Sequence, residues 1–153
     1  ARLIINLEKL YLSLKKLQLK DDKVSTYYNL SHDLGVAQKD MNKLQNKIFG
    51  IECNFEELNG IDFKKGCYVG QENTARIKLK NKLSKRLLPI EIIKGKLIAG
   101  SSIKFGNIEI GKVLIDSEYP FALIKYLDDN FDDKNQFTCE NAVIKIKIPH
   151  WIK

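Results

Sequence analysis

The sequence predicts an α+β protein in which a largely helical N-terminal half precedes a small antiparallel β-barrel. Helix-start and helix-stop residues recur between residues 21 and 58, whereas the chain from residue 86 onward consists of short apolar runs separated by glycine and polar turns. At 153 residues the chain is long enough to bury a core. This length fits one ordinary domain, or one and a half small ones, and a polar, basic stretch at residues 81–85 predicts a linker.

Two elements are predicted before residue 36. Polar and apolar side chains alternate over residues 9–15, which predicts a half-buried strand. A helix is expected to begin at Asp21 and Asp22, because acidic side chains are favourable at the positive end of the helix dipole. This helix should run to about Asp33 and stop at Gly35.

The middle of the chain predicts two further helical segments and one strand. Apolar side chains recur at helical spacing over residues 38–49, and Gly50 is expected to cap that helix at its C-terminus. Asn54 is expected to cap a short helical turn that follows it. The strict alternation of residues 75–80 predicts a strand.

The C-terminal half predicts five or six strands. Apolar runs that suit strands cover residues 87–93, 102–105, 107–115, 121–127 and 142–148. Pro89 suggests an edge strand, because proline lacks a backbone donor, and Gly111 suggests a bulge. Short strands separated by glycine and polar turns are typical of a small closed antiparallel barrel. The acidic residues 128–133 predict a long polar loop, to which we assign no function.

The chain is basic, with 26 lysines and arginines, 19 acidic residues and a net charge of +7. Such a balance can indicate a nucleic-acid or other polyanionic partner. Here the lysines are dispersed and accompanied by many asparagines and isoleucines, as in chains encoded by AT-rich genomes. We therefore interpret them as a solvated surface and do not expect a nucleic-acid partner.

Other features of the sequence concern the cellular compartment. No apolar run approaches the roughly eighteen residues of a membrane-spanning helix, so we expect a soluble protein without a membrane partner. The first residues lack the basic start, apolar core and cleavage site of a signal peptide. The cysteines, Cys53, Cys67 and Cys139, are widely spaced and form no C-x-x-C motif. This spacing predicts neither a disulfide framework nor a zinc site, and fits a reducing compartment.

The most unusual stretch is the signature loop, residues 65–72, which reads K-G-C-Y-V-G-Q-E. Its two glycines permit positive φ angles or the close approach of another group, which predicts a tight, exposed loop with Cys67 at its tip. Lys64, Lys65 and Arg76 would favour the thiolate form of this cysteine if they fold back toward the sulfur. Cys67 is therefore a candidate reactive or ligating thiol, and the alternative is a half-buried cysteine in a hairpin turn.

Residues 60–72, followed by Ala75 and Arg76, resemble the folate-binding iron–sulfur cluster assembly and repair proteins of the YgfZ/IBA57 type. This family belongs to the superfamily of the glycine-cleavage T-protein, called GcvT-like. The resemblance rests on an eight-residue match to the pattern K-G-C-Y-x-G-Q-E, whose residue types rarely occur together by chance. It implies the C-terminal portion of a GcvT-like folate-binding domain at residues 1–80, including the signature, and a β-barrel domain at residues 83–153.

A weaker resemblance extends upstream of the signature loop. The matching positions are Arg2, Leu3, Leu7, Tyr27, Gly35 and Val36. The chain departs from the family pattern at Ser31, where arginine is usual, and at Ala37, where proline is usual. Because the first of these matches lies deep inside the family's folate-binding domain, we expect the chain to be the C-terminal half of a longer protein, or a fragment of one.

The resemblance implies a site centred on Cys67, to which we assign the catalytic role. Cys67 is expected either to take part in sulfur or iron chemistry during cluster delivery or to be alkylated transiently by a one-carbon unit from folate. The expected cofactor-binding residues are Glu52, Lys65, Gly66, Tyr68, Gly70, Gln71, Glu72 and Arg76. No metal-ligating residue is expected.

These residues have different expected roles. Glu52 is expected to face the pteridine or the substrate pocket, because a carboxylate accepts two hydrogen bonds from an aminopyrimidine edge. Tyr68 and Gln71 would offer hydrogen bonds to a ligand. Glu72 would position the loop or Arg76, whose guanidinium could reach a carboxylate or the glutamate tail of folate. The alternative for Glu52 and Arg76 is a charged side chain on the surface.

The implied function is folate-dependent assembly or repair of 4Fe–4S clusters in client enzymes. Tetrahydrofolate is the implied cofactor, with much of its pocket upstream of this chain. The implied partners are iron–sulfur scaffold or A-type carrier proteins and the client enzymes. The implied location is the cytoplasm of a bacterium, or the mitochondrial matrix of a eukaryote. Catalysis, as a transferase-like factor, and delivery without catalysis both stay open.

Two alternatives remain. An aminomethyltransferase of the glycine-cleavage kind shares the superfamily, although T-protein-like chains lack the cysteine signature. A basic RNA-binding or tRNA-binding barrel, linked to tRNA modification, would need aromatic side chains on a strand face for base stacking. The predicted strands present mostly aliphatic side chains with lysine.

Overall fold

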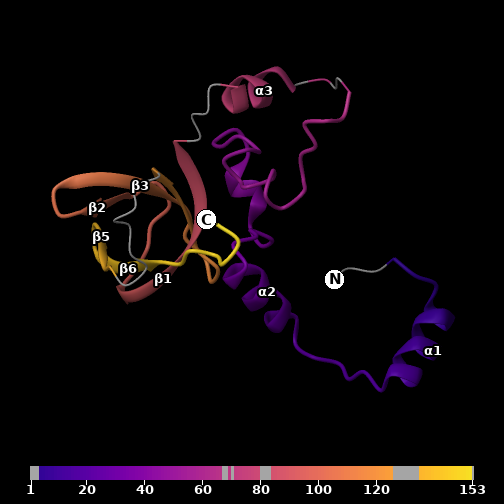
Figure 1. Ribbon diagram of the computed structural model, residues 1–153. Coiled ribbons are helices and arrows are strands. Elements are labelled where there is room, and N and C mark those ends of the chain that lie inside the picture. Colours follow the sequence, from indigo (N-terminus) through magenta and orange to yellow (C-terminus); the bar gives the residue numbers. More distant parts are fainter. Residues whose placement is uncertain (1–3, 67–68, 70, 80–83, 126–134, 153) are drawn as a thin grey trace.

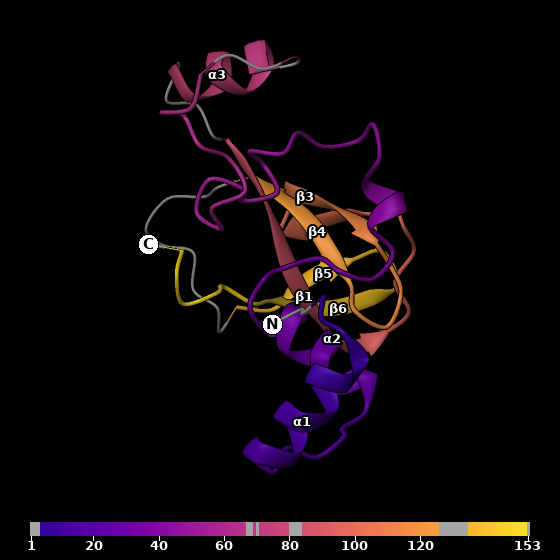
Figure 2. The same cartoon turned by 90° about the vertical axis from the view of Figure 1, so that its right-hand side faces the viewer.

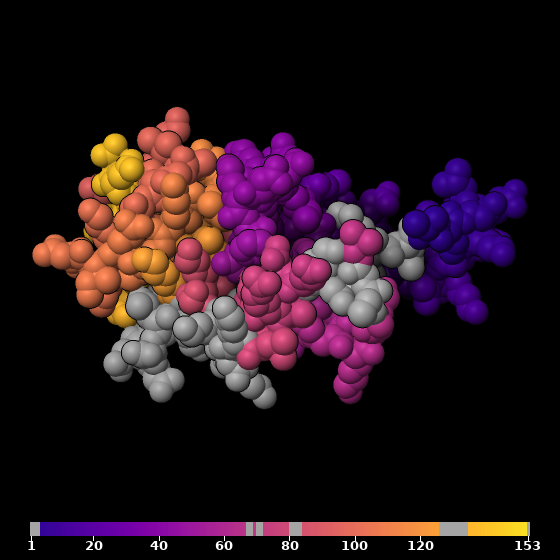
Figure 3. Space-filling view, turned by 90° about the horizontal axis from the view of Figure 1, so that it is seen from above, coloured from indigo at the N-terminus to yellow at the C-terminus, as the bar shows by residue number. Residues whose placement is uncertain are grey.

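The computed structural model describes residues 4–66, 69, 71–79, 84–125 and 135–152. Its helical elements are α1 (Leu7–Leu17), α2 (Val24–Asp33), the 3-10 helix η1 (Met41–Leu44) and α3 (Gln71–Leu79). Figures 1 and 3 show an elongated molecule with a barrel at one end, α1 at the other, and the chain from α2 to α3 between them.

Six antiparallel strands form a closed barrel in the described part of the chain. They are β1 (Lys85–Gly95), β2 (Ser102–Phe105), β3 (Ile108–Ile115), β4 (Phe121–Lys125), β5 (Phe137–Cys139) and β6 (Ala142–Ile146). Their order around the barrel is β1-β4-β3-β2-β5-β6, and the long strand β1 closes it by pairing first with β4 and then with β6. The predicted closed antiparallel barrel is confirmed (Figure 2).

Two local predictions in the barrel have different outcomes. The edge strand suggested by Pro89 is wrong, because β1 changes partner from β4 to β6 between Pro89 and Ile90 and a closed barrel has no edge. The bulge suggested by Gly111 is confirmed, since Ile103 pairs with Gly111 while the next residue of β2 pairs with Glu109. A Cβ on Gly111 would also lie 2.6 Å from the carbonyl oxygen of Leu123, so β4 leaves no room for a side chain there.

Strand β5 was not predicted, because its three residues are too few to form a recognisable apolar run. It pairs with β2 at one position and with β6 at three. Its first residue, Phe137, is buried in the barrel core. The polar loop predicted at residues 128–133 lies outside the described residues.

Two apolar clusters hold the fold together. The first fills the barrel and consists of Leu88, Ile90, Leu97, Ile103, Ile110, Val113, Ala122, Ile124, Phe137, Cys139, Ala142, Ile144 and Ile146. The second lies on the outside of β1, β3 and β4 and joins Leu87, Leu114, Ile115, Phe121 and Leu123 to Ala37, Leu44, Ile48 and Cys53. Residues 37–53 therefore cover part of the outer face of the barrel, and burial of this apolar surface stabilises their position.

Helix α2 matches the helix predicted at residues 21–33, and its C-terminal end packs on the barrel. The ring of His32 packs edge-on against Phe121, and its Nε2 donates a hydrogen bond to the carbonyl oxygen of Pro120 at 2.9 Å. The indole Nε1 of Trp151 donates to the carbonyl oxygen of Leu34, also at 2.9 Å. The C-terminal end of α2 is thereby fixed to the start of β4 and to the segment that follows β6.

Two predicted strands are wrong, because the structure forms helices there. Residues 9–15 belong to α1, whose leucines also recur every three or four residues, and the Asn6 side chain caps the helix by accepting from the backbone N–H of Glu8. Residues 75–79 belong to α3, which is rich in helix-forming residue types. An alternation of six or seven residues is compatible with either structure, and in the described ranges every strand pairs within the barrel, so none is left to pair with these segments.

Two helical predictions in the middle of the chain are also wrong. Over residues 38–49 only η1 is helical, since Asp40 and Asn46, with φ of 60° and 59°, interrupt the helix on both sides. Gly50 does not have the positive φ of a helix-capping glycine. Asn54 has a φ of 62° and binds the barrel with its side chain instead of capping a helical turn.

Candidate functional site

The described part of the signature loop is an exposed tip between residues 50–62 and α3. Val69 is fully exposed, and a Cβ built on Gly66 would have no heavy atom within 4 Å. Helix α3 begins at Gln71, immediately after the loop. Cys67, Tyr68 and Gly70 lie outside the described residues, as does the side chain of Gln71, so their assigned roles remain predictions.

A hollow of about 340 Å³, here called the signature hollow, lies beside the described part of this loop. Its lining residues are Gly50, Phe55, Gly60, Ile61, Asp62, Lys65 and Thr74. It combines an aromatic ring, a carboxylate and an ammonium group. The backbone N–H of Lys64 donates to Asp62 Oδ1 at 2.8 Å, which fixes one oxygen of that carboxylate.

Glycines on both sides give Phe55 its place in the signature hollow. A Cβ on Gly50 would lie 3.1 Å from the ring, and one on Gly60 would lie 3.2 Å from Phe55 Cβ. The ring is about one-third exposed. An aromatic ring that stays open to solvent beside a charged group can stack on a planar ligand.

Helix α3 is attached to the chain that precedes the signature loop. The ammonium group of Lys78 forms an ion pair with Glu56 and lies 5.3 Å from the centre of the Phe63 ring. Such a cation over an aromatic ring adds a modest electrostatic attraction. The chain on the two sides of the loop is therefore linked by side-chain contacts.

Two of the charged residues predicted for the site lie on the exposed surface of α3. Glu72 and Arg76 are one helical turn apart, and no ion pair joins them among the residues that the structure describes. Neither residue lines the signature hollow. Of the predicted cofactor-binding residues with described side chains, only Lys65 does so.

Glu52 connects the chain before the signature loop to the barrel. Its carbonyl oxygen accepts a hydrogen bond from the backbone N–H of Leu87 at 2.8 Å, and its Oε2 accepts from the backbone N–H of Phe49 at 3.0 Å. It is half-buried and does not line the signature hollow. The expected contact of Glu52 with a pteridine remains a prediction.

Asn54 forms a second connection to β1, which the sequence did not reveal. Its Nδ2 donates to the carbonyl oxygen of Leu87 at 2.8 Å, and its Oδ1 accepts from Arg86 at 2.9 Å. Arg86 also forms an ion pair with Glu57. Together these contacts position residues 50–58, and with them one wall of the signature hollow, relative to the barrel.

The two cysteines that the structure describes are poor nucleophiles. Burial raises the pKa of the Cys53 thiol to about 11, and the nearby carboxylate of Glu52 acts in the same direction. Burial also raises the pKa of Cys139. Because the thiolate is the reactive form, both side chains are inert thiols at neutral pH.

The signature hollow also contains residues that received no role from the sequence, namely Phe55, Asp62 and Thr74. Asp62 lies within the run that carries the family resemblance, whereas Phe55 gave no signal beyond its helical context. No cluster of three or more potential metal ligands is found in the described ranges. In the same part of the chain, no helix is both long enough and apolar enough to span a membrane.

No protein-family model matches the chain. Among curated proteins, it is similar to the iron–sulfur cluster assembly factor IBA57 homolog, mitochondrial, of Aspergillus oryzae, with 39% identity over 61 residues, or 40% of this chain and 14% of the relative. The protein of the same name from Dictyostelium discoideum is 38% identical over 77 residues, or 50% of this chain and 18% of the relative. The tRNA-modifying protein YgfZ of Aliivibrio fischeri is 29% identical over 154 residues, or 94% of this chain and 47% of the relative.

The chain is therefore similar to proteins of the YgfZ/IBA57 type. It spans about half the length of the YgfZ relative, and the alignments with the IBA57 homologs cover a smaller share of those proteins. The helices followed by a closed six-stranded barrel confirm the α+β fold class, consistent with the C-terminal part of a YgfZ/IBA57-like protein. The division at residues 80–83 remains a prediction.

Proposed function

We propose that this chain takes part in folate-dependent assembly or repair of 4Fe–4S clusters in client enzymes, with Cys67 as the reacting thiol. The observation that carries the proposal is that the described part of the signature loop is exposed and lies next to a hollow lined by aromatic, acidic and basic residues. The names of the IBA57 homologs, iron–sulfur cluster assembly factors, support the same assignment.

The loop offers a route for iron or sulfur, as substrate, to reach a thiolate. Gly66 leaves open space on its side of the loop, and Lys65 places an ammonium group at the edge of the signature hollow. A cation near a thiol favours the thiolate over the neutral form. Cys53 and Cys139 do not compete, because burial raises the pKa of both.

The signature hollow fits part of a folate molecule. Phe55 offers a ring on which a pteridine can stack, the Asp62 carboxylate can accept hydrogen bonds from an aminopyrimidine edge, and Lys65 can pair with a glutamate carboxylate. Bound tetrahydrofolate would supply a carrier for one-carbon units. Because Oε2 of Glu52 already accepts from Phe49, the expected contact of Glu52 with the cofactor would use its other oxygen.

The proposal extends to partners and compartment. Scaffold or A-type carrier proteins would supply the cluster, and 4Fe–4S enzymes would receive it. The names of the eukaryotic relatives include the word mitochondrial, which supports a mitochondrial location for a eukaryotic protein, in the matrix by this proposal. For a bacterial protein the proposed location is the cytoplasm. Residues 1–80 would belong to the folate-binding domain and residues 83–153 to the barrel domain.

A role in tRNA modification is a second candidate. The relative aligned over 94% of this chain is named a tRNA-modifying protein. Measuring modified nucleosides in tRNA from cells with and without the gene tests this candidate. If cells without the gene have altered tRNA modification while their cluster-containing enzymes retain full activity, the result would favour the role in tRNA modification over the cluster role.

The test of the main proposal is a rescue experiment. Cells that lack their own YgfZ/IBA57-type protein receive the complete gene product that contains this chain, with either native Cys67 or Cys67→Ala, and aconitase-type activity is measured. We expect rescue by the native protein and a loss of at least tenfold with the variant, roughly the scale on which removing a nucleophile acts.

Cys53→Ala is the control for the loss of a thiol, because burial keeps that side chain protonated. Immunoblotting confirms that each variant accumulates as folded protein. Equal rescue by Cys67→Ala would reduce the signature loop to a folding or docking element. Failure of the native protein would remove the cluster role altogether.

A further inference from the structure

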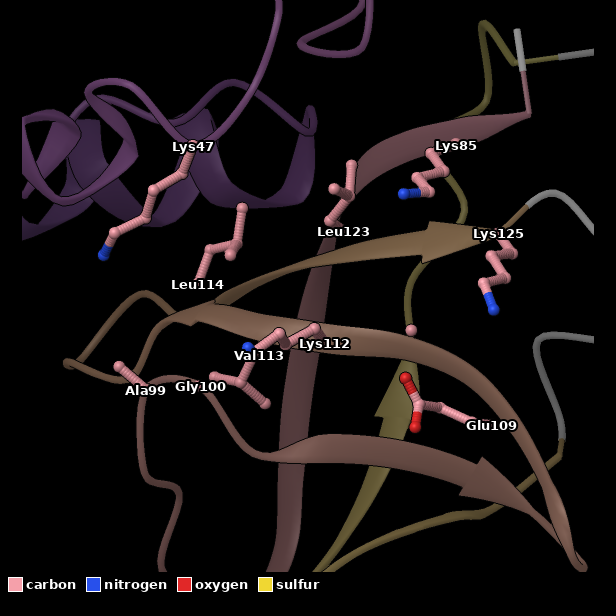
Figure 4. A pocket seen from close by; sticks show the side chains of 11 residues that line it. Lys47, Lys85, Ala99, Gly100, Glu109, Lys112, Val113, Leu114, Leu123 and Lys125 are labelled. Atoms are coloured by element: carbon pink, nitrogen blue, oxygen red, sulfur yellow. The ribbon is translucent and has the colours of Figure 1, made fainter. Parts of the chain in front are cut away.

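A second and larger hollow lies on the outer face of the barrel, away from the signature loop. Its volume is about 430 Å³, and its lining residues are Lys47, Lys85, Ala99, Gly100, Glu109, Gly111, Lys112, Val113, Leu114, Leu123 and Lys125. Figure 4 shows Lys85 and Lys125 side by side at one end and Lys47 near the other. We call it the lysine hollow. Neither the family resemblance nor the proposed function uses it.

The register of the sheet explains how the lysines come together. Lys85 of β1 and Lys125 of β4 are directly opposite one another, and Lys112 of β3 is opposite Leu123 of β4. Since residues two apart on a strand share a face, Lys125 and Leu123 project to the same side. Three adjacent strands therefore present Lys85, Lys125 and Lys112 on one outer face.

This arrangement is unfavourable in the absence of an anion. Like charges directly opposite each other on neighbouring strands destabilise a sheet. In the described ranges, no carboxylate oxygen lies within 4.0 Å of the ammonium groups of Lys47, Lys85, Lys112 or Lys125. The one carboxylate in the lysine hollow, that of Glu109, accepts a hydrogen bond from the Ser102 hydroxyl at 3.1 Å.

Nearby lysines show the more usual arrangement. Lys39 pairs with Glu118 at 2.9 Å, and Lys43 pairs with Asp116 at 2.7 Å. Both lysines belong to the same segment of the chain as Lys47. These pairs attach residues 37–53 to the barrel. Among the residues that the structure describes, the four lysines of the lysine hollow form no such ion pair, and they line a concave surface.

The chemistry of the lysine hollow defines a class of ligand. Its volume is in the range of small-molecule sites, which is about 300–1,000 Å³. Leu114 and Leu123 add apolar surface to its lining, and four lysines add positive charge; an ammonium group can bind phosphate oxygens as a point charge. We propose that the lysine hollow binds a small molecule with two or more phosphate groups, of the size of a nucleoside diphosphate or triphosphate.

Calorimetry on the 153-residue chain tests the proposal, with inorganic pyrophosphate, ATP, adenosine and a short single-stranded RNA as probes. We expect pyrophosphate and ATP to bind and adenosine not to bind, because the ammonium groups recognise phosphate. Lys85→Gln combined with Lys125→Gln should weaken the binding of ATP by roughly tenfold or more, given the usual strength of hydrogen bonds between charged groups.

The matched control combines Lys94→Gln with Lys96→Gln, which removes the same charge from exposed lysines that do not line the hollow. It should leave the affinity for ATP within twofold of the native value. Equal weakening by both double variants would show attraction by net charge alone and would overturn the proposal. Binding of RNA without binding of pyrophosphate or ATP would also overturn it, in favour of a nucleic-acid surface.

Thermal unfolding gives a second readout. ATP should raise the Tm of the native chain and of the control variant, but not that of the Lys85 and Lys125 variant. Without ligand, that variant should unfold at the native Tm or above, because it removes a repulsive pair.

The chain after Lys125 includes Asp128, Asp129, Asp132 and Asp133, which lie outside the described residues. If ATP binds only after these four aspartates are changed to asparagine, the lysines form ion pairs with the chain's own carboxylates, and the proposal is wrong.

Discussion

At the scale of single residues, Asn54 has the most demanding position in the described structure. Its side chain is fully buried and binds both Leu87 and Arg86, and its φ of 62° is one that most residues avoid. Asparagine tolerates this left-handed conformation better than other non-glycine residues. One residue therefore provides both a turn and two hydrogen bonds to the barrel.

We predict that Asn54→Ala lowers the free energy of unfolding by about 3 kcal/mol. This is the sum expected when the buried carbonyl of Leu87 loses its donor and an alanine at position 54 has to adopt a left-handed φ. Urea denaturation measures the loss. Asn59→Ala is the matched control, because Asn59 has a φ of 58° but is exposed. It should cost about 1–2 kcal/mol. Equal losses in both variants would mean that the hydrogen bonds of Asn54 contribute nothing.

His32 makes the stability of the fold depend on pH. Burial lowers its pKa below 6.5, Lys147 acts in the same direction, and the hydrogen bond to Pro120 and nearby carboxylates oppose the shift. The unfolded chain therefore binds a proton at a higher pH than the folded chain does. By linkage, the contribution of neutral His32 to stability is complete above pH 6.5 and is lost as the pH falls from 6.5 to the lower pKa of the folded state.

We predict that the free energy of unfolding of the native chain decreases over this window below pH 6.5, and that His32→Gln removes the decrease. Urea titrations at a series of pH values measure it. His150→Gln, at an exposed position, should keep the native pH dependence. A variant at position 32 with unchanged pH dependence would assign the effect to other groups.

At the scale of elements, Gly35 determines how the end of α2 meets the C-terminal segment. It has a φ of +72°, and a Cβ there would lie 2.5 Å from Pro149 Cγ and 3.3 Å from Trp151 Cζ2. The indole of Trp151 binds the preceding residue, Leu34. Residue 35 can therefore lie this close to Pro149 and Trp151 only because it has no side chain.

We predict that Gly35→Ala destabilises the chain by about 2–3 kcal/mol, from a left-handed backbone and a steric clash, and exposes Trp151 to water. Trp151 is the only tryptophan, so its fluorescence should shift to the red before unfolding begins. Gly106→Ala separates the two causes, because Gly106 has a φ of +59° and open space around its Cβ position. Native fluorescence in Gly35→Ala would contradict the contact.

The elements also differ in how well the sequence predicts them. The barrel strands other than β5 were found because apolar runs, glycine and turns recur over many residues. Over residues 9–15 and 75–80, an alternation of a few residues fits a helix or a strand equally well. Tertiary context decided these segments, since α1 and α3 have no strand beside them.

The signature hollow was predicted only in part. Asp62 and Lys65 belong to a run that can be recognised along the chain, whereas Phe55 and Thr74 join them in the hollow through folding. Glu52 belongs to the same segment, yet its described contacts are with Phe49 and Leu87. A linear motif identifies which residues carry chemistry, but the direction of each side chain depends on its neighbours.

At the scale of the whole molecule, stability is distributed unevenly. The barrel has a continuous core, and residues 37–53 are packed on it. Helix α1 has no buried residue, and Leu7, Tyr11, Leu12 and Leu17 are exposed along it. An isolated helix of eleven residues is only marginally stable in water.

We predict that the backbone amides of α1 exchange with solvent as fast as those of an unfolded peptide, whereas those of β3 and β4 exchange only through global unfolding. Hydrogen exchange with mass spectrometry of the 153-residue chain measures both. Residues 24–33, in α2, serve as an internal reference of intermediate burial. Strong protection of residues 7–17 that grows with protein concentration would show that α1 packs against a second copy.

The sequence by itself determined the α+β class, most of the barrel strands and the signature loop, because these depend on local periodicity and on rare residue types in a fixed order. The tertiary structure alone decided the closure of the barrel by β1, the covering of its outer face by residues 37–53 and the grouping of four lysines around one hollow. The reason is physical: strand register and the packing of distant segments depend on contacts between residues that are far apart in the chain.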